Sequence, residues 1–326
     1  MAATFPVLQR EFSPESEFAV DVRAGLSQQA QKEIPSKYLY DGLGSALFEA
    51  ICFLPEYGLH RAGARLMCRH SSEIARRMRS ATMVAELGSG TGDNVRKLLE
   101  SLASADPIDY FPIDISAHAL TRCRQELGAI EGVRFNPVQS AYLEGLEEVS
   151  RLRGDAGKLI VLFLGSTIGN IDRHEAARFC SQIRRHLRYG DGFVLAADLE
   201  KPISQLISAY DDSVGVTAAF NLNVLARINR ELGANFDLQQ FAHEARWNSA
   251  DRRIEMHLTS QRDQVVMIPA ANIKVSFRAG ETIRTESCHK FNRPEVVEMA
   301  HRAGFRCEAL WIDPEWPFAQ FLFSAA

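Results

Sequence analysis

Residues 86–92 read ELGSGTG, a glycine-rich turn between an apolar run and an amphipathic stretch. Glycine at positions Gly88, Gly90 and Gly92 lets a ligand lie against the backbone, because no Cβ stands in the way. The spacing is G-x-G-x-G, not the G-x-G-x-x-G of dinucleotide sites, and the preceding Glu86 would repel a pyrophosphate. An acid there suits a ligand with a cationic amino-acid tail. The turn therefore favours S-adenosylmethionine, which carries an ammonium group and a sulfonium.

An aspartate near the end of the next expected strand supports this interpretation. Asp114 lies 24 residues after Gly90, an interval that fits a strand–helix–strand unit. At the end of a strand, its carboxylate could accept hydrogen bonds from both hydroxyl groups of a ribose. An ordinary tight turn is the alternative explanation of the glycines, and Asp114 in this context argues against it.

A second polar group follows an almost wholly apolar run at residues 159–166 (LIVLFLGS). Asn170 comes shortly after this run, and ligands of open parallel sheets bind beyond the carboxyl ends of the strands. A carboxamide can accept a hydrogen bond from an amine and donate one to a carboxylate. A turn asparagine in the left-handed region is the alternative reading of Asn170.

Two tyrosines and a glutamate complete the candidates. Tyr57 lies in LPEYG and Tyr210 in AYDD. Two phenol groups can hold a carboxylate without adding charge, although a single tyrosine is more often half-buried packing. Glu286 lies in TIRTESCHKF, residues 282–291, after a strand-like run. Its carboxylate could face solvent, a metal or a substrate.

Strands and helices alternate between residues 61 and 200, which predicts a parallel sheet with right-handed crossovers, a doubly wound Rossmann-like α/β fold. We expect strands at 83–90, 109–116, 133–138, 159–166 and 192–200, and helices at 93–102, 117–127 and 174–187.

The alternation of strands and helices ends after residue 202. Residues 203–233 read as helices, and three strand-like stretches follow within 252–286. Residues 305–326 read as two strands around an Asp-Pro-Glu turn, which would pair at the edge of the first sheet. We therefore expect one domain from 61–202 and 287–326, and a second α+β domain from 1–60 and 203–286.

The composition narrows the class of protein. With 326 residues, 24% charged residues and a net charge of −4, the chain has no general electrostatic reason to bind nucleic acid or anionic lipid. Its six cysteines form no C-x-x-C pair, which indicates free thiols and no metal site. Neither a signal peptide nor an apolar stretch of about 18 residues is evident. We expect a cytoplasmic monomer with a small-molecule substrate and no membrane partner.

These motifs together resemble the ergothioneine-pathway L-histidine Nα-methyltransferases. The resemblance covers almost the whole chain, including TIRTESCHKF (282–291). Its segments are YDGLGSALFEAICFLPEY (40–57), ELGSGTGDNVRKLL (86–99), FLGSTIGN (163–170), AYDDSVGVTAAFNLNVLARINRELGANF (209–236) and RIEMHL (253–258). It implies a class I methyltransferase domain and an inserted substrate domain. It also implies methyl transfer from S-adenosylmethionine to the α-amino group of free histidine, up to the trimethylated betaine hercynine.

The resemblance implies a role for each candidate. Asn170 would hold the substrate amino group, Tyr57 and Tyr210 its carboxylate, and Glu286, helped by Cys288, its imidazole. Phe48, Thr217, Phe220 and Met256 would line the substrate pocket. Asn170 and Tyr40 are the candidate catalytic residues. The expected cofactor contacts are Tyr40, Glu86, Gly88, Gly90, Gly92, Asn94, Asp114, Ala141, Tyr142 and Gly165.

The chain departs from the family pattern at three places, one of which is LPEYGLHR (54–61) where the family more usually has LPEY-x-P-T-R. Cys288 stands where the family has serine, and a thiol is a weaker donor than a hydroxyl. Ser287 cannot replace it, because adjacent strand residues face opposite sides. Ala141 stands where the family often has an aspartate near the adenine. Cys288 keeps open another amino-acid substrate, such as tryptophan or tyrosine, and a non-catalytic cofactor-binding protein is the other alternative. Glu286 favours histidine or an indole, since it can accept from a ring N–H.

The expected chemistry is an in-line displacement at a sulfonium methyl group, for which the protein supplies alignment and desolvation. Asn170 can orient the amine lone pair by accepting one N–H. No general base is evident, and deprotonation could occur through water or on binding.

Overall fold

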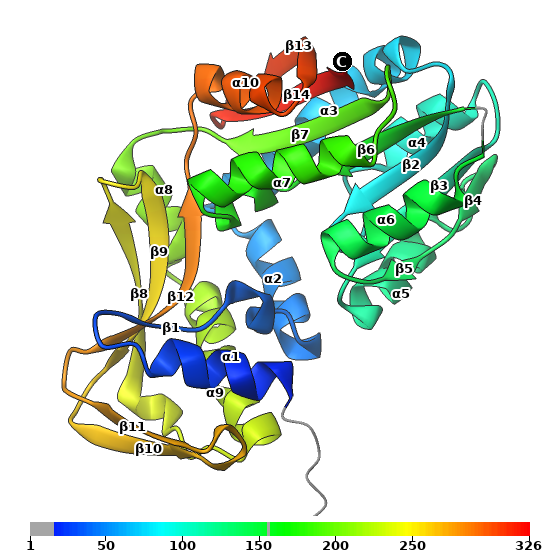
Figure 1. Ribbon diagram of the computed structural model, residues 1–326. Helices are drawn as coiled ribbons and strands as arrows, with labels where there is room; N and C mark the ends of the chain where they lie inside the picture. The colour runs from blue at the N-terminus through cyan, green and yellow to red at the C-terminus, as the bar shows by residue number, and fades with distance from the viewer. Residues whose placement is uncertain (1–15, 155–156) are drawn as a thin grey trace, which may run out of the picture.

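The computed structural model describes residues 16–154 and 157–326, and it shows an upper and a lower lobe joined by several chain crossings (Figure 1). The expectation that the N-terminus carries no signal peptide falls largely on residues 1–15, which lie outside the described part. Within that part, no helix is long and apolar enough to span a membrane.

The upper lobe is built on an eight-stranded sheet whose main strand order is β13-β14-β7-β6-β2-β3-β4, with the short β5 also paired to β3. Strands β2 to β7 are parallel, whereas β14 runs antiparallel to β7 and to β13. This order confirms the predicted doubly wound, Rossmann-like sheet and its C-terminal strand pair. The strands are β2 (Ala81–Leu87), β3 (Ile108–Asp114), β4 (Val133–Phe135), β5 (Val138–Gln139), β6 (Lys158–Phe163), β7 (Gly192–Asp198), β13 (Phe305–Ile312) and β14 (Phe318–Ala325).

Helices cover both faces of this sheet (Figure 1). Helices α3 (Gly58–Arg77), α4 (Arg96–Ala103) and α5 (Ala117–Leu127) bury apolar side chains against one face. Helices α6 (Tyr142–Leu152), α7 (Arg173–Arg185) and α10 (Arg293–Arg302) cover the other. The two central strands β2 and β6 are buried almost throughout, which explains why residues 159–163 are uninterrupted apolar text.

The lower lobe contains a four-stranded sheet in the order β1-β12-β9-β8 and a separate hairpin, β10–β11. Helix α9 packs on β8, and α2 packs on α9 between the lobes (Figure 1). Residues before 60 join residues after 203 here, because β1 pairs with β12. The strands are β1 (Lys32–Glu33), β8 (Phe241–Asn248), β9 (Arg253–Ser260), β10 (Gln264–Ile268), β11 (Ile273–Phe277) and β12 (Thr282–His289); the helices are α1 (Glu17–Leu26), α2 (Gly42–Phe53), α8 (Ile203–Tyr210) and α9 (Val216–Leu232). The exact domain boundaries stay a prediction.

Short 3-10 turns join these elements. They are η1 (Ser36–Leu39), η2 (Thr167–Asn170), η3 (Leu238–Gln240) and η4 (Pro269–Ala271). The second of them follows β6 and carries Asn170 at its end, so the segment after the central apolar strand is a structured turn.

Three strand predictions were wrong in detail. The third expected strand is two short strands, β4 and β5, separated by Asn136 and Pro137, since proline cannot donate to a ladder. The last of the strand-like stretches expected within 252–286, at 273–286, is two strands in different sheets, β11 and β12, and β12 continues past Glu286 to His289. Strand β8 was missed because its sequence, FAHEARWN, lacks a clean apolar–polar alternation.

A β-bulge in β12 changes which side chains face inward. The pairing of β12 with β9 shifts register between Arg284 and Glu286. Both Thr285 and Glu286 are buried as a result, although strict alternation would place neighbours on opposite faces. Thr285 donates to Asn221 of α9, at 2.5 Å, while Glu286 turns toward the other lobe. The bulge thus aims Glu286 at the space between the two sheets.

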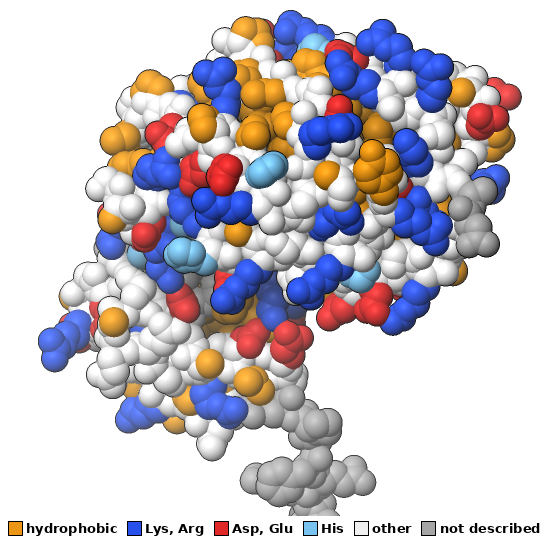
Figure 2. All heavy atoms as spheres, turned by 45° about the horizontal axis from the view of Figure 1, so that its top comes forward, with side chains coloured by type: hydrophobic (Ala, Val, Ile, Leu, Met, Phe, Trp, Pro, Cys, Tyr) orange, Lys and Arg blue, Asp and Glu red, His pale blue; other side chains and the backbone are white. Residues whose placement is uncertain are grey.

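Acidic and basic side chains are interspersed on the face that Figure 2 shows, over both lobes. The arginine pairs Arg76–Arg77 and Arg184–Arg185 belong to the last turns of α3 and α7. No described residues form a group of three or more metal-ligating side chains.

One ion pair fixes the C-terminal hairpin to the helix layer. Arg65 of α3 donates to both oxygens of the buried Asp313, at 2.8 and 2.6 Å. The same carboxylate accepts from the backbone N–H groups of Glu315 and Trp316, at 3.1 and 2.9 Å. The turn predicted between β13 and β14 therefore depends on the aspartate at its start.

We expect Asp313→Ala to lower the free energy of unfolding by about 2–4 kcal/mol, because it removes the acceptor of two Arg65 donors and of the buried Trp316 N–H. Denaturant unfolding would measure the change. Glu315→Ala is the matched control: its exposed carboxylate lies 3.1 Å from the same arginine, and its loss should cost under about 1 kcal/mol. Equal effects of the two substitutions would contradict the assignment.

Candidate active site

A cavity of about 570 Å³ lies between the carboxyl ends of the parallel strands and the second sheet. This is the edge at which doubly wound sheets bind ligands. All of the site residues predicted from the sequence line it: Tyr40, Phe48, Tyr57, Glu86, Gly88, Gly90, Gly92, Asn94, Asp114, Ala141, Tyr142, Gly165, Asn170, Tyr210, Thr217, Phe220, Met256, Glu286 and Cys288. The structure brings them together; their individual roles stay predictions.

The glycine-rich turn forms one wall of the cavity. Gly88 has φ +71°, and a Cβ there would lie 3.2 Å from the Tyr142 ring, so both conformation and space favour glycine. At Gly90, which has φ +52°, an added Cβ would meet no protein atom within 4 Å. That space belongs to the cavity, and a ligand could therefore lie directly against the turn.

Asp114 holds the turn in place and faces the same space. Its carboxylate accepts from Gly90 N–H at 3.1 Å and from Ser116 N–H at 2.9 Å. A carboxylate has about four acceptor positions, so two N–H contacts leave capacity for ribose hydroxyl groups. Burial raises the pKa of Asp114, although the two backbone hydrogen bonds oppose that shift.

Glu86 lies beneath the turn and is 3% exposed. The Tyr110 hydroxyl donates to its carboxylate. Burial raises the pKa of Glu86 to about 8, and nearby Asp114 adds to the rise. Within residues 16–154 and 157–326, no cationic side chain pairs with the Glu86 carboxylate. An ammonium group supplied by a ligand would stabilise its ionised form.

The two lobes meet in a hydrogen bond between candidate residues. Asn170 Nδ2 donates to Glu286 Oε1 at 2.8 Å. Burial raises the pKa of Glu286 to about 7, while the nearby charge of Lys290 and the Asn170 hydrogen bond lower it. Glu286 is therefore an inward-facing acceptor, held by the turn that follows β6, and the surface alternative for this residue is wrong.

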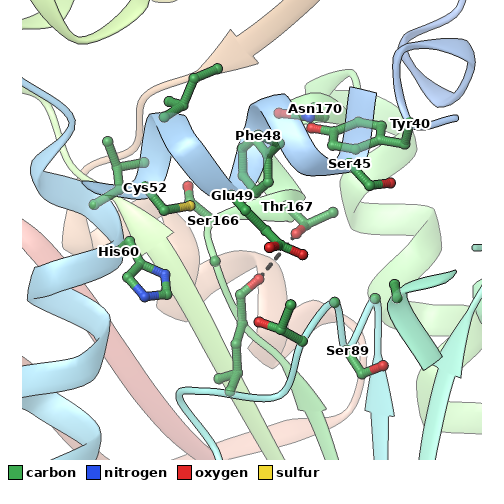
Figure 3. Close-up of a pocket in the computed structure, with 18 of the residues that line it drawn as sticks. Tyr40, Ser45, Phe48, Glu49, Cys52, His60, Ser89, Ser166, Thr167 and Asn170 are labelled. Atoms are coloured by element: carbon green, nitrogen blue, oxygen red, sulfur yellow. Dashed lines mark hydrogen bonds between the residues drawn. The ribbon is translucent and has the colours of Figure 1, made fainter. Parts of the chain in front are cut away.

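Five aromatic rings surround the centre of the cavity. Tyr40 lies edge-on to Phe48 and to Phe220, with ring centroids 5.5 Å apart in both pairs. Tyr57 and Tyr210, which come from different lengths of chain, approach to 6.1 Å. Burial raises the pKa of both Tyr57 and Tyr210 well above their ordinary range, so both phenols keep their protons as donors. Figure 3 shows Phe48 projecting from its helix into the cavity.

The strand that carries Glu286 separates its side chains as expected. Glu286 and Cys288 line the cavity, and Ser287 between them does not. His289 turns away from Cys288, and its Nδ1 lies 3.2 Å from the carbonyl of Asp251. Burial raises the pKa of the Cys288 thiol, so it stays protonated. It is a neutral polar group within the wall and has no activating base.

Several lining residues were missed from the sequence. Helix α2 presents Ser45, Glu49 and Cys52 beside Phe48, on one face of the helix (Figure 3). Their spacing of three and four residues is a helical signal that could have identified them. Lys290, behind the cavity wall, was also missed. It lies two and four residues after Cys288 and Glu286, and the same strand alternation that selected those residues points to it.

The side chains around the glycine-rich turn match the functional groups of S-adenosylmethionine. The open space at Gly90 admits a ligand against the backbone, Asp114 has acceptor capacity for a ribose, and Glu86 can take an ammonium group. Ala141 and Tyr142 at the start of α6 face the same space. With Ala141 lacking a polar side chain, any polar contact at this point must come from neighbouring groups.

We expect the affinity for S-adenosylmethionine to rise by up to about tenfold per pH unit between pH 6 and pH 7, since binding the ammonium needs the ionised form of a carboxyl with pKa about 8. One proton should be released on binding. Calorimetry in two buffers of different ionisation enthalpy measures that proton. Glu86→Gln should bind more weakly and lose the pH slope; a wild-type affinity that is flat over this range would contradict the role of Glu86.

Comparison with known proteins gives a consistent family. Residues 18–325 match the family model described as "Histidine-specific methyltransferase, SAM-dependent". The chain is 42% identical over 300 residues to the histidine N-alpha-methyltransferase of Mycolicibacterium smegmatis, covering 91% of this chain and 92% of that protein. It is also 42% identical over 302 residues to the enzyme of the same name from Mycobacterium tuberculosis, with the same coverage.

A more distant relative is named for a tryptophan derivative. The 4-dimethylallyltryptophan N-methyltransferase of Epichloe festucae var. lolii is 26% identical over 315 residues, covering 89% of each chain. The family match confirms the predicted transferase class and its use of S-adenosylmethionine, and the alternative of a non-catalytic protein is wrong. The chain belongs to the histidine-specific, S-adenosylmethionine-dependent methyltransferase family.

Proposed function

We propose that the protein transfers methyl groups from S-adenosylmethionine to the α-amino group of free L-histidine, up to the trimethylated betaine hercynine. The observation that carries the proposal is the Asn170–Glu286 hydrogen bond, at 2.8 Å. It joins, on one cavity wall, an acceptor suited to an amine and an acceptor suited to an imidazole N–H. The phenols of Tyr57 and Tyr210 lie in the same cavity as candidates for the carboxylate.

The amide of Asn170 has a defined polarity toward the amine. Because its NH₂ group donates to Glu286, its carbonyl oxygen is the group left for a substrate. A carbonyl oxygen accepts one N–H of the amine and leaves the nitrogen lone pair free to approach the methyl group. Asn170 therefore orients the nucleophile without taking its proton, and deprotonation falls to water or to the binding step.

The bound cofactor supplies an electrophilic methyl group on a sulfonium. The protein's task is to align the amine with that methyl and to exclude water. Tyr40, Phe48 and Phe220 bring apolar ring surface to the same cavity. Ring faces attract quaternary ammonium groups. This lining therefore suits successive methylation up to the permanently charged product.

Recognition of the side chain rests on β12 and β9. Glu286 would accept from one imidazole nitrogen, strengthened if the ring is protonated. Cys288 lies on the same face and could donate its S–H to the other nitrogen. Met256, paired with Glu286 across the strands, and Thr217 of α9 line the cavity beside them. A competitor without ring N–H groups would leave the buried Glu286 carboxylate with Asn170 as its donor and no donor from the ligand, which is costly.

We propose further that the protein acts as a monomer in the cytoplasm. The monomer is supported by the cavity itself: the residues assigned to the amine, the carboxylate and the imidazole all come from one chain, so no partner subunit is needed to complete it.

Mass spectrometry after incubation with S-adenosylmethionine and a mixture of all free amino acids tests the function. We expect histidine to gain one, two and three methyl groups in turn. Methyl gain on tryptophan or tyrosine, with histidine untouched, would keep the chemistry and reassign the specificity. No gain on any amino acid would overturn the proposal.

We expect Glu286→Gln to reduce kcat/KM for histidine by roughly 10- to 100-fold, the loss of a charge-assisted hydrogen bond. The affinity for S-adenosylhomocysteine should stay within about twofold of wild type, because Glu286 lies on the wall opposite the glycine turn. Steady-state kinetics and calorimetry measure the two quantities. An unchanged kcat/KM would remove Glu286 from substrate recognition.

Cys288→Ser tests the departure from the family pattern. A hydroxyl is a stronger donor than a thiol, so we expect KM for histidine to fall by roughly 3- to 10-fold with little change in kcat. Cys288→Ala is the control that removes the donor and should raise KM. If serine and alanine have the same effect, Cys288 makes no hydrogen bond to the substrate.

A further inference from the structure

A buried ammonium group lies directly behind the substrate-facing wall. The Lys290 side chain is fully buried, and its Nζ donates to the Tyr210 hydroxyl oxygen at 2.9 Å and to Cys288 Sγ at 3.3 Å. The same Nζ forms an ion pair with Asp198 Oδ2 at 2.9 Å. Lys290 itself does not line the cavity, whereas Tyr210 and Cys288 do.

The Lys290 ammonium group stays protonated. Burial alone would lower the pKa of Lys290, but the ion pair with Asp198 raises it above the ordinary range. The second lysine on Asp198 behaves differently: burial lowers the pKa of Lys201 to about 8. Lys290 is therefore the lysine of the cluster that keeps its positive charge. A charged lysine can donate hydrogen bonds but cannot accept them.

We propose that Lys290 is a positioning residue that forces the Tyr210 hydroxyl and the Cys288 thiol to act as donors toward the substrate. Each of these groups can both donate and accept. Because Lys290 donates to the oxygen of one and the sulfur of the other, their own hydrogens point away from Lys290. The two groups also interact with each other, so a substrate carboxylate in the cavity that both line replaces that contact when it accepts from Tyr210.

This inference rests on the proposed function, in which Tyr210 holds the substrate carboxylate. A phenol that must donate suits a carboxylate, which can only accept. Burial keeps the pKa of Tyr210 well above its ordinary range, so the proton needed for that bond is retained. The positive charge behind the phenol adds attraction for the carboxylate. An amine that lacks a carboxylate gains nothing from the Lys290–Tyr210 part of this arrangement.

The test compares histidine with histamine, which keeps the imidazole and the amine but has no carboxylate. We expect Lys290→Met to raise KM for histidine by roughly tenfold or more, with kcat within about threefold of wild type. The inhibition constant of histamine should rise by no more than about threefold, because histamine keeps the imidazole and loses only the weaker thiol contact at Cys288. A general loosening of the cavity would weaken both ligands.

Two comparisons isolate the role of Lys290. Lys201→Met removes the other lysine of Asp198, which the structure does not place against Tyr210 or Cys288, and should leave KM for histidine within about twofold. In the Tyr210→Phe background, Lys290→Met should add less than about threefold to KM, because the group on which it acts is gone. Independent, multiplying effects of the two substitutions would overturn the inference.

The remaining outcomes are also decisive. If Lys290→Met and Lys290→Gln both fail to bind S-adenosylhomocysteine while Lys201→Met binds it, the role of Lys290 is structural and the inference is overturned. A histidine KM unchanged in Lys290→Met overturns it as well. A wild-type protein that does not methylate histidine overturns the proposed function, and this inference with it.

Discussion

The structure depends on one buried carboxylate at the junction of its two sheets. Asp198, the last residue of β7, pairs with Lys290, just after β12, and with Lys201, and its Oδ1 accepts from Trp316 Nε1 at 3.0 Å. Backbone bonds between Phe291 and residues 198 and 200 continue the contact. Removing one member of such a cluster leaves a buried charge unpaired, so the cluster fixes β12 against the end of the parallel sheet.

That junction determines what the cavity can do. The parallel sheet alone presents the glycine turn, Asp114 and Asn170 along one edge, which suffices for a cofactor and an amine. The second sheet adds Glu286 and Cys288 only because β12 is held against that edge. The bulge before Glu286 then turns its carboxylate inward, where it meets Asn170. Asn170, the residue proposed for the amine, and Glu286, the residue proposed for the side chain, are thus joined by one hydrogen bond between the lobes.

The sequence predicted the features that depend on residues close together in the chain. The glycine turn, Asp114 and Asn170 each follow an apolar strand at a fixed interval, and the resemblance to a family supplied Tyr57, Tyr210 and Glu286. It missed the Asp198–Lys290 pair, whose members are 92 positions apart. It also missed the bulge at Thr285, since a register shift depends on the partner strand. Strand parity, applied to Cys288, was not carried on to Lys290, which has no obvious chemistry until Asp198 is placed beside it.

The polarity of the wall explains why a carboxylate and a thiol can serve together at the ring. A neutral imidazole has one N–H donor and one acceptor nitrogen, so it needs one partner of each kind. Glu286 in its ionised form only accepts, and Cys288, with its sulfur occupied by a lysine donor, is left to donate. An indole has a donor and no acceptor nitrogen, so it would satisfy Glu286 and leave Cys288 unused. An unused thiol is less costly to bury than an unused hydroxyl. Cys288 therefore reduces the difference in binding free energy between an imidazole and an indole without removing it.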